Sequence, residues 1–334
     1  MIISKTPFRI SFFGGGTDYP KWYRVKKNVG KVLNVSIDKY SYIVCRYLPP
    51  FFNYKYRIRY FKREETKTIE AIKHPIVRET LKFLKIDKGI ELVHHADLPA
   101  RSGLGSSSTF TVGLLKVLYE LKKKKITKKL LASQAIFIEQ NLVKEIVGSQ
   151  DQVIASYGGL NKITFSKNNF YSEFSVKKIN CSQQRIKNLE SNLMLFFTGL
   201  VRTAEIIAKE QVEQIQKNEI ILKEMVDIVD EGEKILEKEN LKIKEFGKLL
   251  DIQWKLKKSL SKNISNKQLD QYYNCGIEAG ALGGKLLGAG SGGFLLFYVE
   301  KKNQQKVKKN LKKLLHVPFK FETYGSKILY NQNN

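Results

Sequence analysis

The sequence predicts an α+β fold of two domains, on the basis of its length, its composition and the order of its local patterns. The chain has 334 residues, enough for about two domains of ordinary size. Hydrophobic residues make up 42% and charged residues 27%, as in folded globular proteins. Helical and strand patterns are mixed in both halves without the regular alternation of a doubly wound sheet. We therefore expect helices and strands to share each domain.

The first 60 residues are expected to form strands and turns. Residues 8–13 are apolar and aromatic, residues 14–16 are three glycines that favour a turn, and residues 31–60 are rich in Val, Ile and Tyr. A further short strand is expected at 90–94. The chain therefore opens with β-structure.

Two helices are expected next. A glycine-serine segment, 103–108, precedes an apolar helix face that recurs at i, i+4, i+7, i+8 and i+11. That face consists of Phe110, Leu114, Val117, Leu118 and Leu121. A second helix over 127–146 has an apolar stripe with Glu139 beside it, and Gly148 ends it. A glycine-serine loop therefore opens a helix.

The second half is expected to be mainly helical. Strands at 163–165 and 170–176 precede a polar stretch, 177–190, which is the predicted boundary between domains 1–185 and 186–334. A strand at 194–197 follows, and then helices over 203–240, 241–260 and 266–282. The chain ends with a strand at 294–299, a lysine-rich helix and a short strand near 319–323.

The formal net charge of +27 is the strongest compositional signal. Such a surface attracts nucleic acid, anionic lipid or small phosphorylated molecules, and charge alone does not choose among them. Only 10 of the 59 basic residues are arginine, the side chain that reads and stacks on bases. We therefore expect no nucleic-acid or membrane partner, and a basic nucleic-acid-binding protein is the alternative from a different class.

The sequence also carries expectations about location. Its longest apolar run, 294–299, is far shorter than the roughly 20 residues of a membrane-spanning helix. The start, MIISKTPFRI, lacks the apolar region of a secretory signal. Cys45, Cys181 and Cys275 are too few and too scattered for a disulfide framework or a zinc site. We expect a cytoplasmic protein with reduced cysteines.

Three glycine-rich segments are candidates for chemistry: FGGGTD at 13–18, PARSGLGSSS at 99–108 and KLLGAGSGGF at 285–294. Glycines let the backbone approach a ligand closely, and the N-terminus of a helix attracts phosphate. Ser106, Ser107 and Ser108 could therefore contact phosphate or a phosphate-bound Mg²⁺. The alternative is that these serines only cap the helix.

The third segment also contains a G-x-G-x-x-G pattern at Gly288, Gly290 and Gly293. A dinucleotide fingerprint follows a strand and opens a helix, whereas here we expect a helix before the pattern and a strand after it. The sequence contains no G-x-x-x-x-G-K-[ST] loop and no H-R-D and D-F-G pair of protein kinases. Any nucleotide would therefore be bound by another scheme.

The three segments, in this order, resemble the motifs of the GHMP kinase family. Residues 7–18 are similar to its first motif, Pro99 and residues 103–108 to its P-x-x-x-G-L-G-S-S-[AS] motif, and residues 285–293 to its K-x-x-G-A-G-x-G-G motif. The resemblance implies a two-domain α+β fold with the active site in the interdomain cleft. It also implies an ATP-dependent kinase that uses Mg²⁺, with an oligomeric state that the sequence leaves open.

The resemblance implies a role for each candidate residue. Asp151 would be the base, Arg9 its cationic neighbour, and Ser107 and Glu139 would hold Mg²⁺. The expected ATP-binding residues are Pro99, Arg101, Ser102, Gly103, Leu104, Gly105, Ser106, Ser107 and Ser108. The expected substrate-binding residues are Gly15, Gly16, Thr17, Asp18, Gly290 and Arg202. Arg202 is the candidate for binding a phosphate group of the sugar substrate that is remote from the reacting hydroxyl, because arginine can bind phosphate with two hydrogen bonds.

Departures from the family pattern narrow the expected substrate. Galactokinases have G-E-H where this chain has Gly14, Gly15 and Gly16, which makes galactose a poor candidate, while Asp18 resembles the sugar ligand of sugar kinases. The runs TPFRISFFGGGTDYPKWY and FTGLVRTAEIIAKEQ look most like the branch of the family that phosphorylates heptose 7-phosphate at its anomeric hydroxyl. That activity leads to GDP-heptose for surface glycans. L-fucose kinases are the alternative within the family.

Overall fold

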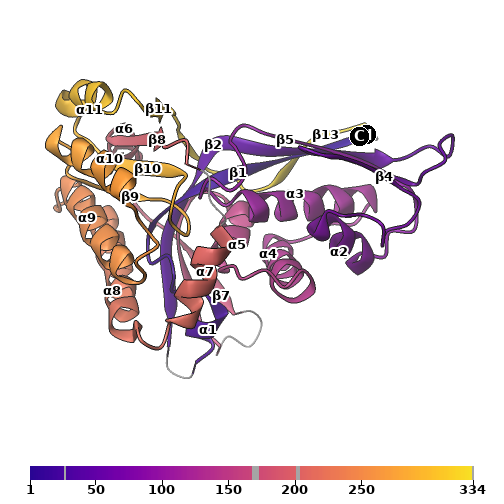
Figure 1. Cartoon of the computed structure of the whole chain (residues 1–334), viewed down its shortest axis with the longest axis horizontal. Helices are drawn as coiled ribbons and strands as arrows, with labels where there is room; N and C mark the ends of the chain where they lie inside the picture. Colours follow the sequence, from indigo (N-terminus) through magenta and orange to yellow (C-terminus); the bar gives the residue numbers. More distant parts are fainter. Residues whose placement is uncertain (26–27, 168–172, 201–203, 333–334) are drawn as a thin grey trace.

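The computed structural model describes residues 1–25, 28–167, 173–200 and 204–332. Helices pack against two sheets, A and B, and strands and helices are mixed along the chain (Figure 1). The predicted α+β class is confirmed. The strands are β1 (Ile2–Phe13), β2 (Gly30–Tyr47), β3 (Tyr56–Arg59), β4 (Arg63–Thr66), β5 (Ile90–Ala96), β6 (Leu160–Phe165), β7 (Phe174–Lys178), β8 (Leu193–Phe197), β9 (Gly283–Leu286), β10 (Phe294–Tyr298), β11 (Leu315–His316), β12 (Phe321–Glu322) and β13 (Lys327–Asn331).

Helices lie between and after these strands. They are α1 (Pro20–Tyr23), α2 (Pro75–Phe83), α3 (Ser106–Leu121), α4 (Lys128–Phe137), α5 (Gln150–Tyr157), α6 (Gln183–Ser191), α7 (Ala204–Glu213), α8 (Glu219–Glu237), α9 (Lys244–Ser259), α10 (Lys267–Glu278) and α11 (Gln304–Asn310). A π-helical turn, Ile138–Leu142, follows α4, and a 3₁₀ turn, Lys301–Asn303, precedes α11. None of the helices in the described part of the chain combines the length and the apolar character that a membrane crossing requires.

Sheet A is centred on the antiparallel pair β1 and β2, whose register runs from Ile2 opposite Cys45 to Phe13 opposite Leu33. Its order is β13-β1-β2-β5-β3-β4, with β12 and β6 also paired to β2, and β7 paired to β6. Sheet B has the order β11-β8-β10-β9. The final strands β12 and β13 therefore return to sheet A after the chain has built sheet B. The domain boundary at residue 185 stays a prediction.

Strand β1 divides its side chains between a core and the cleft. Successive side chains of a strand point to opposite faces. Phe8, Ile10 and Phe12 belong to a buried cluster with residues of α8 and α9, while Arg9 and Ser11 line a cavity. This one strand therefore both packs against the second half of the chain and presents polar groups to the site.

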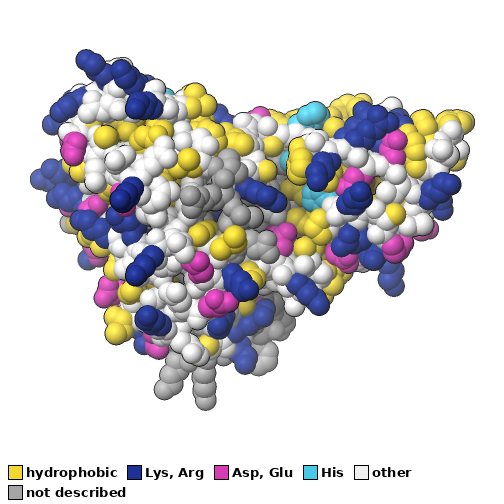
Figure 2. Space-filling view, in the orientation of Figure 1, with side chains coloured by type: hydrophobic (Ala, Val, Ile, Leu, Met, Phe, Trp, Pro, Cys, Tyr) yellow, Lys and Arg dark blue, Asp and Glu magenta, His cyan; other side chains and the backbone are white. Residues whose placement is uncertain are grey.

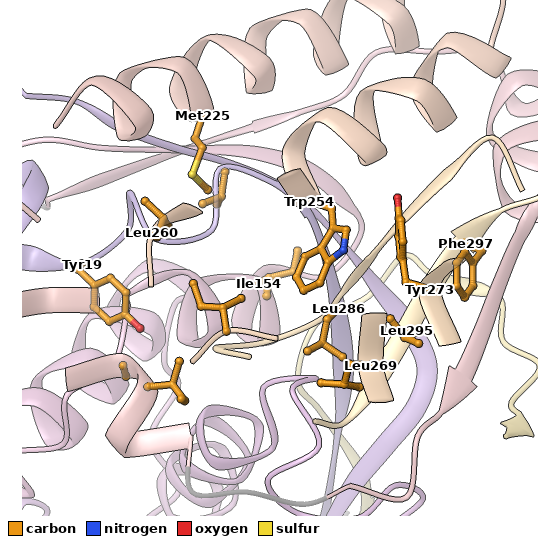
Figure 3. Packing of buried hydrophobic residues seen from close by; sticks show 14 of the residues in the cluster. Tyr19, Ile154, Met225, Trp254, Leu260, Leu269, Tyr273, Leu286, Leu295 and Phe297 are labelled. Atoms are coloured by element: carbon orange, nitrogen blue, oxygen red, sulfur yellow. The ribbon is translucent and has the colours of Figure 1, made fainter. Parts of the chain in front are cut away.

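The helices pack in two groups (Figure 1). Helix α3 contacts β1 and β2, and α5 contacts α3 and the same strands. Helix α8 contacts β1 and β2, and α9 contacts β9 and β10. Figure 3 shows Trp254 of α9 among apolar side chains that include Leu269, Tyr273 and Leu286, all in one buried cluster. This packing holds α9 over β9 and β10, the strands on either side of the glycines at 288–293.

Several expectations about elements need correction. The helix expected over 203–240 is two helices, α7 and α8, because the turn before α8 is tied to the end of α9 by a buried bond from the Asn218 amide to the Leu260 carbonyl, 2.9 Å. The helix expected over 127–146 changes to a π turn at Ile138. The polar stretch predicted to be the domain boundary contains α6, and strand β9, not a helix, precedes the G-x-G-x-x-G pattern that begins at Gly288. Helix α2 and strand β13 were not among the elements expected from the sequence.

Candidate active site

A cavity of about 300 Å³ lies where the three glycine-rich segments meet. Its lining comes from β1 and the loop after it, the start of α3, the start of α5, α7, α9 and β9 with the loop after it. The predicted site residues that line it are Arg9, Gly15, Gly16, Asp18, Arg101, Gly103, Gly105, Ser106, Ser107, Ser108 and Asp151. Segments far apart in the sequence therefore converge on one cavity.

Arg9 and Asp151 form a two-pronged ion pair in this cavity. Arg9 Nε donates to Asp151 Oδ1 and Arg9 Nη2 to Oδ2, both at 2.6 Å, and Nη1 donates to the Gly103 carbonyl at 2.7 Å. The Arg9 side chain is 6% exposed and that of Asp151 21%. Two parallel hydrogen bonds of this kind hold the carboxylate in one orientation. The pair joins a possible proton acceptor to the glycine-rich loop at 99–108.

The loop at 99–108 presents the N-terminus of α3 to the cavity. Gly105 is the N-cap, with a positive φ of 81°, and no side chain caps it. The capping alternative for the serines is therefore wrong, and Ser106 Oγ instead accepts a bond from the Arg101 amide at 3.1 Å. An uncapped helix start offers N–H groups and a positive dipole end to an anion.

The third segment packs directly on this loop. Gly288 and Gly103 are so close that a methyl group on either would overlap the backbone of the other segment. Both have positive φ, 76° and 84°. A methyl group on Gly293 would overlap the Ser102 carbonyl in the same way. The glycines are therefore required by close approach as well as by conformation.

Asp18 lies in the wall of the cavity, beside Gly15 and Gly16. Its carboxylate accepts bonds from the amides of Gly16 (3.0 Å) and Gln150 (3.2 Å) and is almost fully buried. Burial raises the pKa of the Asp18 carboxyl, and the nearby Asp151 raises it further. Gly148 leaves no room for a side chain against this carboxylate. The arrangement fixes a buried carboxyl group in the same cavity as Asp151.

Glu139 is buried behind the serines of the loop. Its Oε2 accepts bonds from Ser108 Oγ (2.9 Å) and Gln152 Nε2 (2.6 Å), and the Thr111 hydroxyl lies near the same carboxyl. Among the described residues, none is within hydrogen-bonding geometry of Oε1. Burial raises the pKa of the Glu139 carboxyl to about 8. The serine that contacts Glu139 is Ser108, whereas Ser107 lines the cavity.

The described residues hold no cluster of three or more His, Cys, Asp or Glu side chains suited to a metal. Mg²⁺, however, is usually held by one or two carboxylates together with substrate phosphates. The free Oε1 of Glu139 and the hydroxyl of Ser107 are hard oxygen donors of this kind. The oxygen donors of these two residues suit a phosphate-bound Mg²⁺, but only Ser107 lines the cavity, whereas Glu139 is fully buried behind the loop. Their role as Mg²⁺ ligands stays a prediction.

Two buried lysines in the cavity were missed by the sequence reasoning. Lys285 donates to the carbonyls of Ser11 and Phe12, both at 2.8 Å, and Lys257 donates to the Gly288 carbonyl. Lys285 is the first position of the K-x-x-G-A-G pattern, which was a usable signal. Lys257 is one of many lysines, and its only signal is that it shares the apolar stripe of α9 with Leu250 and Trp254.

Some predicted residues do not line the cavity. Pro99 is exposed, Leu104 and Ser102 are buried beneath the loop, and Gly290 packs on Ile264. Thr17 is buried and donates to the carbonyls of Gly14 and Lys31 at 2.8 and 2.9 Å, so that it stabilises the turn. Arg202 lies outside the described residues.

Comparison with known proteins identifies the family. The model "GHMP kinases N terminal domain" matches residues 67–159, and "GHMP kinases C terminal" matches residues 236–317. The chain is 31% identical to D-glycero-alpha-D-manno-heptose 7-phosphate kinase of Campylobacter jejuni subsp. jejuni serotype O:2, over 93% of both proteins. This chain belongs to the GHMP kinase family. The family resemblance is thereby confirmed, and the second and third motifs lie inside the matched residues.

Two further similarities agree with this GHMP kinase assignment. The bifunctional fucokinase/GDP-fucose pyrophosphorylase of Arabidopsis thaliana is 26% identical over 96% of this chain, which spans 32% of that protein. A solved structure described as a D-glycero-D-manno-heptose 1-phosphate kinase from Bacteriodes thetaiotaomicron shares the fold, with a TM-score of 0.80 at 22% identity over 99% of both chains. As a GHMP sugar kinase, the chain is an ATP-dependent phosphotransferase with an alcohol group as acceptor.

Proposed function

We propose that this GHMP kinase transfers the γ-phosphoryl group of ATP to the anomeric hydroxyl of D-glycero-α-D-manno-heptose 7-phosphate. The product is the 1,7-bisphosphate, a precursor of the GDP-heptose used for surface polysaccharide. The reaction takes place in the cytoplasm. The similarity over almost the whole chain to a heptose 7-phosphate kinase supports this substrate. The observation that carries the reaction type is the Arg9–Asp151 ion pair beside the uncapped start of α3.

The proposed chemistry begins with the sugar hydroxyl against Asp151. The hydroxyl oxygen forms a bond to the γ-phosphorus, the bond from that phosphorus to the bridging oxygen of ADP breaks, and the hydroxyl proton passes to the Asp151 carboxylate. Arg9 holds that carboxylate with two bonds of 2.6 Å and adds positive charge. When bound, Mg²⁺ would neutralise charge on the ATP phosphates, with Ser107 and Glu139 as its protein ligands.

The sugar is proposed to lie against Gly15, Gly16 and Asp18. Glycines at these positions leave space where larger polar side chains would reduce the cavity, and Asp18 offers carboxylate oxygens to sugar hydroxyls. A buried carboxylate is a selective acceptor, because a sugar that lacks the matching hydroxyl leaves it unpaired. This space is consistent with a seven-carbon sugar.

L-Fucose is the second candidate substrate. The similarity to a bifunctional fucokinase over 96% of this chain favours it. The two candidates differ in charge, because the heptose carries a phosphate remote from the reacting hydroxyl and L-fucose carries none. A remote phosphate supplies binding energy that positions the anomeric oxygen, so removing it should lower kcat as well as affinity.

The deciding experiment compares three acceptors. ADP release is measured with D-glycero-D-manno-heptose 7-phosphate, L-fucose and galactose at equal concentrations, and the phosphorylated carbon is identified by NMR. We expect a kcat/KM for the heptose phosphate at least about tenfold above that for either free sugar. Faster use of L-fucose would replace the proposed substrate, while the kinase assignment would stand.

A further inference from the structure

Helix α9 directs one of its lysines into the protein. Lys257 is 4% exposed, whereas Lys255 and Lys258, two positions before and one after, have side chains 70% and 36% exposed. Lys255 and Lys258 pair with Asp251 and Asp270. Helix geometry explains the difference, because Lys257 is one turn after Trp254, which lies deep in the apolar cluster of Figure 3.

The Lys257 ammonium lies between the two ends of the candidate site. It donates to the Gly288 carbonyl, and Gly288 packs against Gly103 of the loop at 99–108. Its charged neighbours are Arg9, Asp18 and Asp151. The ammonium therefore lies in the same cavity as the phosphate loop and the carboxylates of Asp18 and Asp151.

Lys257 has more hydrogen-bonding capacity than its protein partners use. An ammonium has three N–H donors, and within the described part of the chain only the Gly288 carbonyl accepts one. Arg9, in contrast, uses all three of its nitrogens on Asp151 and Gly103. A buried charge without full hydrogen bonding is unfavourable, and burial lowers the pKa of Lys257 to about 8. An anionic ligand in the cavity would provide the missing acceptors.

We propose that Lys257 is a further catalytic residue, whose ammonium contacts the γ-phosphoryl oxygens of bound ATP while that group passes to the sugar. Lysine suits this role because it is a compact charge with three movable donors. The role adds charge stabilisation on the phosphoryl oxygens and moves no proton. The proposal rests on the kinase reaction proposed above, but not on which sugar is accepted.

The first test measures nucleotide binding without a sugar. Titration calorimetry with Mg²⁺ gives the dissociation constants of ADP and of the non-hydrolysable ATP analogue AMPPNP for the full chain. In Lys257→Met we expect the ratio of the AMPPNP constant to the ADP constant to rise at least about tenfold, because only AMPPNP has the third phosphate. Lys255→Met, the same change on the exposed side of α9, should leave the ratio unchanged.

The second test measures turnover. Lys257→Met should lower kcat about 100-fold or more, the usual effect of removing a group that stabilises developing charge. If Lys257→Met does not fold, as judged by thermal unfolding, Lys257→Gln is measured in the same way, since it keeps a donor for Gly288.

An unchanged ratio of the AMPPNP and ADP dissociation constants in a folded variant would overturn the proposal, even if kcat fell, because a structural change weakens the binding of both nucleotides alike. Failure of every sugar to react would instead count against the proposed function and leave the binding test valid.

Discussion

Asp151 is the residue whose loss should affect the reaction most. Asp151→Asn removes the proposed proton acceptor and leaves the loop at 99–108 intact, so we expect kcat to fall at least about 100-fold with little change in ATP affinity. Steady-state kinetics and ATP titration measure the two effects. Asp87→Asn, in an exposed position, is the matched control. More than about a tenth of the normal kcat in Asp151→Asn would contradict the assignment of the base.

Ser107 and Glu139 should act together on Mg²⁺. Ser107→Ala and Glu139→Gln each remove a hard oxygen donor, so both should raise the Mg²⁺ concentration needed for half-maximal activity. The double variant should show less than the sum of the two effects in free energy, because both groups serve one ion. Magnesium titrations of the three variants test this. An unchanged Mg²⁺ requirement in both single variants would leave Ser107 and Glu139 with structural roles alone.

The buried Glu139 should also make stability depend on pH. Its pKa in the folded chain, about 8, lies above its ordinary value of 4.5, so the folded state binds the proton more tightly than the unfolded state. The contribution of Glu139 to the free energy of unfolding is fully present below about pH 4.5 and is lost as pH rises toward 8. Without Mg²⁺, we expect the free energy of unfolding of the wild type to fall relative to Glu139→Gln, by up to roughly 1.4 kcal/mol per pH unit. Urea unfolding from pH 5 to 8 measures this, and parallel curves would contradict it.

Helix α8 is attached to sheet A by charged side chains. Glu233 accepts bonds from Lys162 and from Lys177, the latter at 2.6 Å, and Lys162 also reaches Asp230 at 3.0 Å. The Glu233 and Lys162 side chains are 11% and 17% exposed, so their pair is better protected from solvent than an ordinary surface pair, whereas Lys177 is 55% exposed. The attachment holds α8 against strands β6 and β7 of sheet A.

Glu233→Gln should therefore destabilise the fold by about 1 to 3 kcal/mol, the range for hydrogen bonds to charged groups. Thermal or urea unfolding measures the loss. The control is Glu219→Gln on the same helix, whose pair with Lys223 is about half exposed and should contribute little. Equal stability of the two variants would show that the attachment of α8 depends on its apolar contacts alone.

The charge of the whole molecule bears on how substrates reach the site. On the face shown in Figure 2, Lys and Arg side chains are scattered, with acidic side chains among them. A net charge of +27 attracts anions over a distance that salt shortens to about 10 Å at 0.1 M. Such a field speeds encounter with phosphorylated substrates and does not select among them.

The proposed phosphosugar should therefore respond to salt, while a neutral sugar should not. We expect KM for the heptose phosphate to rise several-fold between about 0.05 M and 0.5 M KCl, with KM for L-fucose nearly constant. ATP is kept saturating, so that its own salt dependence does not enter. Equal responses of the two sugars would show that charge plays no part in binding the acceptor.

The sequence by itself determined the local structure of the site and its family. Helix α3 begins as its pattern predicts, since apolar spacing and a preceding glycine are local signals. The three glycine-rich segments were found from the sequence because close approach and positive φ leave few other residues possible at Gly103 and Gly288. Arg9, Asp151 and Asp18 were named through the family resemblance that these segments carry, and they line one cavity.

Only the tertiary structure decided what these groups contact. The break between α7 and α8 depends on a bond from Asn218 to Leu260, which no local pattern contains. The serine that contacts Glu139 is Ser108 rather than Ser107, and the second partner, Gln152, comes from α5; both contacts form only when these elements are assembled. Lys257 resembles the solvated lysines around it until α9 is packed on sheet B. Burial is a property of the assembled chain, and burial gives Lys257 and Glu139 their unusual chemistry.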